Sequence, residues 1–384
     1  MKTLVLFIDM VRPSHLGKLH LKSTLPIERF LGRMNGTHYL NCHTPSPDTT
    51  RSMACFWSGS PPQLNGCNTR IKWPRFFLDS NLGNIYEDLS KAGVRMNFFH
   101  EPNEVEVGVL PLGAEKYAYA SYDLKSFLEL CASDRAQENI FNYIGLSDFH
   151  LQFNSYGYDI DGVIDSHEIL EAPLKLVESH IADIKYDHVI VFSDHGYLIQ
   201  EEMSKPEIYL SEIRSNILLF HHKRGDDTIV KSDKFCSIMS IRPFIAGLFN
   251  IKRDLQYDAP FNEAKERDYI LLEDHQSYQP RIRHNIDYWG VRYNKALYAR
   301  TITRRFLDGK EIQANDSFAV EGDRILREYT DLLSYENEYD ALLRHKVWMN
   351  KERSGAISAL SDGSPRRKRS FVSRILRAVR SRCM

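Results

Sequence analysis

Two short apolar runs, each followed by an aspartate, constrain the fold of this 384-residue chain most. Residues 4–8 precede Asp9, and residues 189–192 precede a Ser-Asp-His-Gly tetrapeptide that contains Asp194 and His195. Continuous apolar runs of this length are typical of strands buried on both faces of a parallel sheet. Because ligands of open α/β sheets lie beyond the carboxyl ends of the strands, the three side chains are predicted to meet there. For the tetrapeptide alone, an ordinary polar turn is the alternative.

The chain between and after these runs alternates strand-like and helix-like segments. Strands are predicted at 37–42, 93–99, 141–146 and 216–220, and helices at 51–59, 84–92, 122–138, 166–184 and 240–249. Pro173 is expected to mark a helix start or a kink. The alternation predicts an α/β fold, a mostly parallel sheet flanked by helices.

The character of the sequence changes after about residue 250. Aromatic and charged residues interleave from there, with strand-like pieces at 268–272 and 295–301, which predicts a smaller α+β portion. We therefore expect a catalytic α/β domain at 1–250, a C-terminal α+β subdomain at 251–350, a Ser/Gly/Ala-rich linker at 351–365 and a basic tail at 366–384.

Composition favours a soluble protein of the cytoplasm. Apolar residues make up 42% and charged residues 26%, and no run approaches the roughly 18 apolar residues that cross a membrane. The apolar start of the chain is short, ends at Asp9 and lacks a cleavage site, so we expect a core strand rather than a signal peptide. The six cysteines show no zinc spacing and are expected to be reduced, mostly buried thiols.

The tail at 366–384 has the pattern of a basic amphipathic helix. It carries eight Arg and Lys and no acidic residue, and because the net charge is −1 the rest of the chain carries −9. Phe371, Ile375 and Val379 fall on one face at a spacing of four. This pattern predicts attachment to an anionic membrane surface on the cytoplasmic side. An RNA-binding arm and a solubilising tail are alternatives, although no nucleic-acid partner is expected.

The segment around Thr49 is the third element of the predicted site. Asp48, Thr49 and Thr50 can cap a helix that begins near Arg51, and a hydroxyl there faces free N–H groups that favour an anion. Simple capping is the alternative. If Thr49 converges with Asp9, Asp194 and His195, these ligands suit Zn²⁺, Mn²⁺, Mg²⁺ or Ca²⁺. A metal beside Thr49 would lower its hydroxyl pKa and make it a nucleophile.

Several segments then fall in a recognisable order. The strand ending at Asp9 is followed by Thr49-x-x-Ser52 before a helix ending at Ser58-Gly59, and later by Phe-Ser-Asp-His-Gly at 192–196. Segments 85–95 and 213–220 add to the match. Over residues 1–250 this order resembles the sulfatase-like branch of the alkaline phosphatase superfamily.

The resemblance implies roles for individual residues. Asp9, Asp194 and His195 would be metal ligands, and Thr49, ten residues before Gly59, would be the nucleophile, with Thr50 as the second choice. His150, in a Ser-Asp-Phe-His segment similar to the Asp-Pro-His of the family, would bind substrate or a second metal; an ordinary loop histidine is the alternative.

Three further polar residues lie near these segments. Arg51 and Arg12 are candidates to neutralise a substrate anion, or are solvated surface residues. Ser52 is expected to pack or cap rather than to catalyse.

One departure from the family pattern directs the functional prediction. Thr49-Thr50-Arg51-Ser52-Met53 stands where sulfatases have Cys-x-Pro-Ser-Arg, and relatives with Thr here include phosphoethanolamine and phosphoglycerol transferases. We therefore expect a metal-dependent phosphotransferase or phosphoester hydrolase with a phosphothreonine intermediate, acting on lipid-linked or cell-surface glycan precursors. A sulfuric-ester hydrolase and a non-catalytic binding protein on a degenerate scaffold are the alternatives.

Overall fold

The computed structural model describes residues 1–15, 24–65, 83–100, 118–119, 123–156, 158–203, 210–252, 260–263, 269–275, 287–293, 296–301 and 304–329. These residues all fall within one compact unit, Met1–Tyr329. The predicted linker at 351–365 and tail at 366–384 lie outside the described residues, and the predicted boundary at residue 250 stays a prediction.

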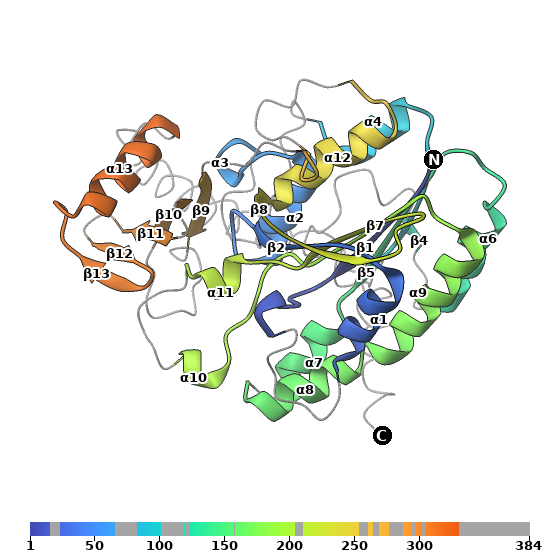
Figure 1. Ribbon diagram of the computed structural model, residues 1–384, viewed down its shortest axis with the longest axis horizontal. Coiled ribbons are helices and arrows are strands. Elements are labelled where there is room, and N and C mark those ends of the chain that lie inside the picture. The colour runs from blue at the N-terminus through green and yellow to red at the C-terminus, as the bar shows by residue number, and fades with distance from the viewer. Residues whose placement is uncertain are drawn as a thin grey trace, which may run out of the picture. The chain divides into compact units, whose positions relative to one another are not determined.

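An eight-stranded sheet forms the centre of this unit, with strand order β4-β3-β5-β1-β6-β7-β2-β8 (Figure 1). Of these strands only β7 runs antiparallel to its neighbours, which confirms the predicted mostly parallel sheet. The strands are β1 (Lys2–Ile8), β2 (Gly36–His43), β3 (Arg95–Phe99), β4 (Ala118–Tyr119), β5 (Ile140–Leu146), β6 (His188–Phe192), β7 (Leu219–Lys223) and β8 (Ile229–Ser237).

Strand β1 contributes to a hydrophobic core on each face of the sheet. Leu4, Leu6 and Ile8 face one core and Val5 and Phe7 the other, all fully buried, because successive side chains of a strand point to opposite faces. The first core is closed by α1 (Pro26–Met34), α6 (Leu124–Ser133), α7 (Asp148–Tyr156), α8 (Ile160–Glu168) and α9 (Glu171–Ile184). The second is closed by α2 (Thr49–Ser58), α4 (Ile85–Lys91) and α12 (Ile241–Leu248) (Figure 1).

Two details differ from the sequence prediction. The expected helix over 166–184 is two helices, α8 and α9, and Pro173 lies in the first turn of α9, where its missing N–H needs no partner. Strand β8 was not predicted because Ile229–Ser237 is polar and largely exposed, as suits the edge of a sheet. No helix among the described residues is both long enough and apolar enough to cross a membrane.

A second, antiparallel sheet confirms the smaller C-terminal α+β portion. Its strands are β9 (Tyr269–His275), β10 (Asp287–Tyr293), β11 (Ala296–Arg300), β12 (Arg305–Leu307) and β13 (Lys310–Ile312), in the order β13-β12-β11-β10-β9. Helix α13 (Ser317–Tyr329) packs closely on β11, since a Cβ at Gly322 would lie 2.2 Å from the Tyr298 ring. The sheet shares a small hydrophobic core with Leu210. Elsewhere in the chain, the described elements include three short helices: α3 (Pro62–Asn65), α10 (Gln200–Met203) and α11 (Glu212–Ser215).

A buried arginine ties α2, α4 and α12 together. Arg242 of α12 donates from Nε and Nη2 to Asp88 Oδ2 of α4 at 3.2 and 2.9 Å, and from Nη1 to the carbonyl of Ser58, the last residue of α2. Both side chains of the ion pair are 2% exposed. Removing one partner of a buried pair leaves an uncompensated charge, so loss of either side chain alone is expected to destabilise the protein strongly.

We therefore predict that Asp88→Ala lowers the free energy of unfolding by about 3–5 kcal/mol, because the guanidinium of Arg242 stays buried without its carboxylate. Urea unfolding followed by circular dichroism measures the change. The matched control is Lys91→Ala, which removes the exposed Glu87–Lys91 pair of the same helix and should change stability by less than about 1 kcal/mol. Equal effects of the two substitutions would contradict the assignment.

Candidate active site

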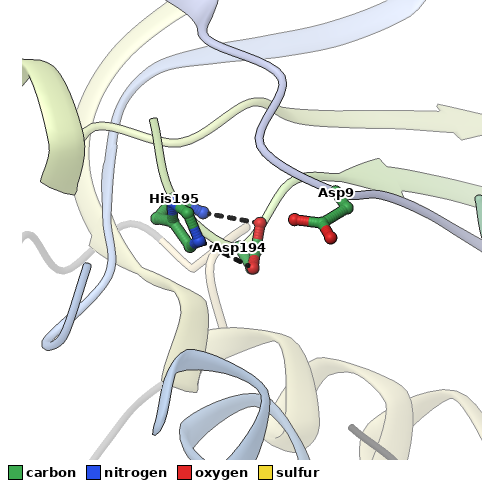
Figure 2. A group of neighbouring side chains, drawn as sticks. All are labelled: Asp9, Asp194 and His195. Atoms are coloured by element: carbon green, nitrogen blue, oxygen red, sulfur yellow. Dashed lines mark hydrogen bonds and ion pairs between the residues drawn. The ribbon is translucent and has the colours of Figure 1, made fainter. Parts of the chain in front are cut away.

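The register of β1 and β6 brings Asp9 and Asp194 side by side. Phe7 pairs with Phe192 in parallel register, and each aspartate lies two residues further on, at the same level of neighbouring strands. Adjacent strands lie about 4.8 Å apart, so two acidic side chains at one level are forced close together. Ligand atoms of Asp9, Asp194 and His195 all lie within 4.8 Å of one another (Figure 2). The structure thus brings together three of the four predicted metal ligands at the carboxyl edge of the sheet.

Backbone N–H groups fix the orientation of Asp194. Its Oδ1 accepts hydrogen bonds from the backbone N–H of Met10 at 3.0 Å and of His195 at 2.9 Å. Met10 has φ +66°, an uncommon conformation for a residue with a side chain. Met10 directly follows Asp9 in the chain, and its N–H binds Asp194, so this residue links the two aspartates. Uncommon backbone conformations of this kind are often found at functional sites.

The carboxylate pair suits a cation. Asp9 Oδ1 and Asp194 Oδ2 are buried and make no hydrogen bond of good geometry within the protein, although buried carboxylate oxygens are normally bonded. Burial, and further the adjacent Asp9 carboxylate, raises the pKa of Asp194 to about 6, against the opposing effect of His195. Two oxygen ligands without partners beside an imidazole fit a divalent metal ion.

A hydrogen bond to the next residue orients the ring of His195. Nδ1 lies 2.8 Å from the Gly196 carbonyl oxygen, which can only accept, so Nδ1 is the donor. Nε2 faces the acidic cluster and lies 3.4 Å from Asp194 Oδ2. Gly196 is required at the next position, because a Cβ there would lie 2.2 Å from the carbonyl oxygen of Ile213.

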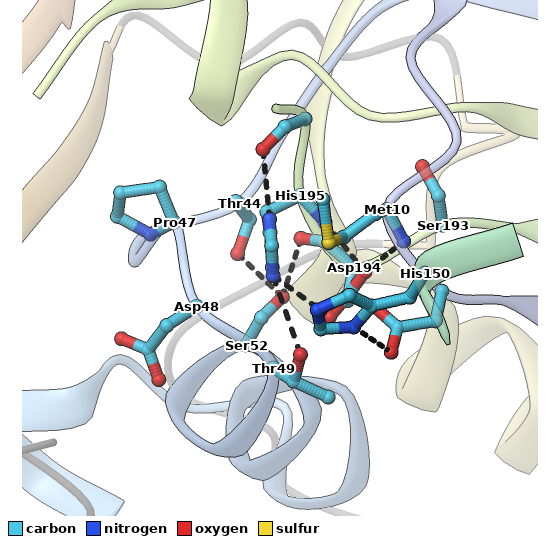
Figure 3. A network of polar contacts seen from close by, with 12 residues as sticks. Met10, Thr44, Pro47, Asp48, Thr49, Ser52, His150, Ser193, Asp194 and His195 are labelled. Carbon is cyan, nitrogen blue, oxygen red and sulfur yellow. Dashed lines mark hydrogen bonds and ion pairs between the residues drawn. The ribbon is translucent and has the colours of Figure 1, made fainter. Parts of the chain in front are cut away.

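Thr49 reaches the same cluster from helix α2 (Figure 3). Its Oγ1 lies 3.3 Å from His195 Nε2, and it is close enough to Asp194 to favour the ionised carboxylate. The helix begins at Thr49, two residues earlier than predicted, with Asp48 as the N-cap that accepts from Arg51 N at 3.2 Å. Thr49 therefore lies at the positive end of the helix dipole. The side chain of Thr50, the next residue, is buried.

Two further predicted residues complete the network. His150, near the start of α7, lies with Nδ1 2.7 Å from Asp9 Oδ2, and a third of its side chain is exposed. Ser52 donates to the Asp194 carbonyl oxygen at 2.7 Å and shares a 2.6 Å hydrogen bond with Thr44. Ser52 thus connects α2 to the loop after β6, in agreement with the packing role expected for it.

The two arginines occupy different settings. Arg12 makes a bidentate ion pair with Glu202 at 2.7 and 2.8 Å, and it also donates to the Tyr197 carbonyl at 3.2 Å. Arg51 is fully buried and is paired with Asp48 and, at 3.7 Å, with Glu273. Carboxylates inside the protein compensate both charges. Glu273 was missed by the sequence analysis, because it lies on a strand of the second sheet and no local motif marks it.

We predict that Asp194→Asn stabilises the protein in the presence of a chelator. Asp194 has a raised pKa, so its stabilising contribution is complete below about pH 4 and is lost as pH rises through about 6, costing about 1–3 kcal/mol at pH 7–8. The neutral amide avoids this cost while keeping an acceptor for the two N–H groups. Thermal unfolding at pH 4 and pH 8 should show a higher Tm for the variant at pH 8 only.

Added Mn²⁺ or Zn²⁺ should raise the Tm of the unsubstituted protein and leave that of the variant unchanged. A Tm gain in the variant as large as in the unsubstituted protein would rule out Asp194 as a ligand.

Comparison with known proteins places this geometry in a fold family. No protein-family model and no curated protein sequence matches the chain. A phosphonate monoester hydrolase from Silicibacter pomeroyi has a similar structure, with TM-score 0.63 and 13% identity, covering 88% of this chain and 95% of its own. A 2-O GAG sulfatase gives TM-score 0.62 at 12% identity, covering 87% and 91%. A protein solved with its substrate D-glucosamine-2-N,6-O-disulfate gives 0.57 at 10%, covering 88% and 97%.

These similarities extend over most of each chain. The chain therefore has a sulfatase-like fold, which it shares with these hydrolases.

Proposed function

We propose that the protein is a metal-dependent phosphotransferase or phosphoester hydrolase with Thr49 as its nucleophile. The observation that carries the proposal is the position of the Thr49 hydroxyl, 3.3 Å from His195 Nε2 and at the start of α2. A hydroxyl at a helix N-terminus, next to ligands for a cation, is where a phosphoryl group would be bound and attacked.

Asp9, Asp194 and His195 would hold a divalent ion, Zn²⁺, Mn²⁺, Mg²⁺ or Ca²⁺, with the Thr49 oxygen as an additional ligand. When bound, such an ion favours the deprotonated hydroxyl and stabilises charge on phosphoryl oxygens. The donor set fits this role because one buried oxygen of each carboxylate, Asp9 Oδ1 and Asp194 Oδ2, makes no hydrogen bond of good geometry within the protein.

The residues of the chain define the remaining steps. Thr49 Oγ1, after losing its proton to solvent, would attack phosphorus, and the new O–P bond would form as the bond to the ester oxygen breaks. The leaving alkoxide would depart with the bonding electron pair and take a proton from water. The positive end of the α2 dipole, at Thr49, would favour the anionic oxygens. His150, oriented by its contact with Asp9, would bind the substrate. Water or an alcohol then attacks the phosphothreonine and restores Thr49.

Sulfuric-ester hydrolysis is the second candidate, since several similar structures are sulfatases. Thr49 weighs against it, because the cysteine of the sulfatase signature is replaced. A non-catalytic protein would be expected to lose some of the site, yet Asp9, Thr49, Asp194 and His195 lie together here.

The substrate class is proposed to be glycan precursors, free or lipid-linked. One similar structure was solved with a sulfated sugar. The basic tail at 366–384 supports a place at the cytoplasmic membrane face, since eight cationic residues with an apolar stripe favour anionic lipid.

We predict that Thr49→Ala lowers phosphodiesterase activity by about 10³-fold or more, because the attacking oxygen is lost. Thr49→Ser should keep activity within about 10-fold, and Thr50→Ala, the matched control on the same helix, within about 3-fold. Rates on a panel of phosphodiester and sulfate esters measure the effect. Intact mass after a brief incubation should show one phosphoryl-type adduct, absent in Thr49→Ala.

Two results would contradict this assignment. Full activity of Thr49→Ala with unchanged metal content would exclude the nucleophile. Turnover of sulfate esters alone would replace phosphoester chemistry by sulfatase chemistry.

We also predict that deletion of residues 366–384 abolishes binding to vesicles containing anionic lipid, measured by co-sedimentation. Replacement of Arg374, Arg377 and Arg380 by Gln should weaken binding by at least about 10-fold, since each charge near the surface contributes about 1 kcal/mol. Vesicles of neutral lipid are the control. Undiminished sedimentation of the deletion variant would refute membrane attachment by the tail.

A further inference from the structure

The second sheet contacts the segment that leads into Thr49. The backbone N–H of Glu273, in β9, donates to the Pro45 carbonyl at 2.8 Å, and its carbonyl accepts from Ser46 Oγ at 3.2 Å. The backbone N–H and the backbone carbonyl of Glu273 therefore both form hydrogen bonds with the loop between β2 and α2. Such paired bonds fix this loop against β9 at the point where the helix is about to begin.

The Glu273 side chain extends this contact to the helix itself. It is 1% exposed, and its Oε1 lies 3.7 Å from Nη1 of Arg51, which is fully buried. Arg51 Nε donates to Asp48 Oδ2, and Asp48 Oδ1 accepts the Arg51 backbone N–H at 3.2 Å. Charged groups therefore form a row, Glu273–Arg51–Asp48, that ends at the N-cap of α2.

The two carboxylates of this row contact Arg51 from different sides and have different roles. Asp48 uses one oxygen for the helix cap and the other for the guanidinium, so the position of Arg51 controls the orientation of the cap. Glu273 attracts Arg51 from the opposite side, and charge attraction is strong where water is excluded. Without the Glu273 charge, Arg51 keeps its ion pair with Asp48, so the buried guanidinium is not left unpaired and the protein should still fold.

We propose that Glu273 is a positioning residue, which holds the first turn of α2 so that Thr49 Oγ1 is directed at the acidic cluster. The proposal rests on the proposed function of Thr49. Reactive groups must be held within about 0.5 Å of their working geometry, and Thr49 is the first residue of the helix that this row caps. The second sheet would then act in catalysis without touching substrate.

The test compares Glu273→Gln with Glu212→Gln. At 3.7 Å the Glu273–Arg51 contact is electrostatic rather than a hydrogen bond, so a neutral amide loses most of it. Glu212 is the matched control, because it pairs with Arg292 of the second sheet at 2.8 Å but belongs to α11 rather than α2. Each substitution removes one carboxylate charge from an ion pair of the second sheet.

The first readout is amide hydrogen exchange, which does not depend on activity. In Glu273→Gln, exchange at residues 50–52 should become about 10-fold faster, while residues 55–58 at the other end of α2 stay unchanged. Glu212→Gln should leave both parts of the helix unchanged. Unaltered exchange at residues 50–52 in Glu273→Gln would overturn the proposal.

The second readout is the kinetics of phosphoester turnover. Glu273→Gln should lower kcat by about 10-fold and change KM by less than about 2-fold, because attack and not substrate binding is affected. Faster exchange with an unchanged kcat would overturn the positioning role. If Glu273→Gln shows faster exchange but the unsubstituted protein turns over no ester, the contact between Glu273 and α2 is supported. The proposed function is then refuted instead.

Discussion

Two carboxylates held side by side away from water are the constraint on which the site depends. The parallel register of β1 and β6 places Asp9 and Asp194 at one level, and neither strand can shift without turning its core residues to the wrong face. The surroundings answer part of this charge: two backbone N–H groups bind Asp194 Oδ1, and the His195 ring lies beside the pair. The fold therefore fixes the geometry of the two carboxylates at which we propose that a metal ion binds.

Helix α2 is the second rigid part, since a buried arginine holds each of its ends. Arg51 connects its first turn to Asp48 and Glu273, and Arg242 binds the carbonyl of its last residue and the Asp88 carboxylate. Between them Phe56 and Trp57 are almost fully buried in the core. A helix held in this way has little freedom left to lose, and under the proposed function this would hold the Thr49 hydroxyl in its working position.

The sequence allowed the sheet and the acidic cluster to be predicted because both are encoded locally. An apolar run followed by Asp9 or Asp194 encodes in a few residues both the strand and the acidic group after it. Because the strands are parallel, these acidic groups then lie at the same edge of the sheet. The settings of Arg12 and Arg51 were open because their partners, Glu202 and Glu273, are distant in sequence. The reversed direction of β7 and the existence of β8 likewise depend on pairing with other strands rather than on their own residues.

The central place of β1 also has a consequence for how the chain is made. Strand β1 pairs with β5 and β6, both of which lie more than 130 residues later in the chain (Ile140–Leu146 and His188–Phe192), so its partners are synthesised long after it. Until then both edges of a strand that is apolar from Leu4 to Ile8 stay open, a state that favours pairing with other chains. Nascent chains should therefore be prone to such pairing until β6 has been made, and folding should be slow because its central contacts are far apart in sequence. An N-terminal fragment that stops before β6 would be a poor starting point for expression.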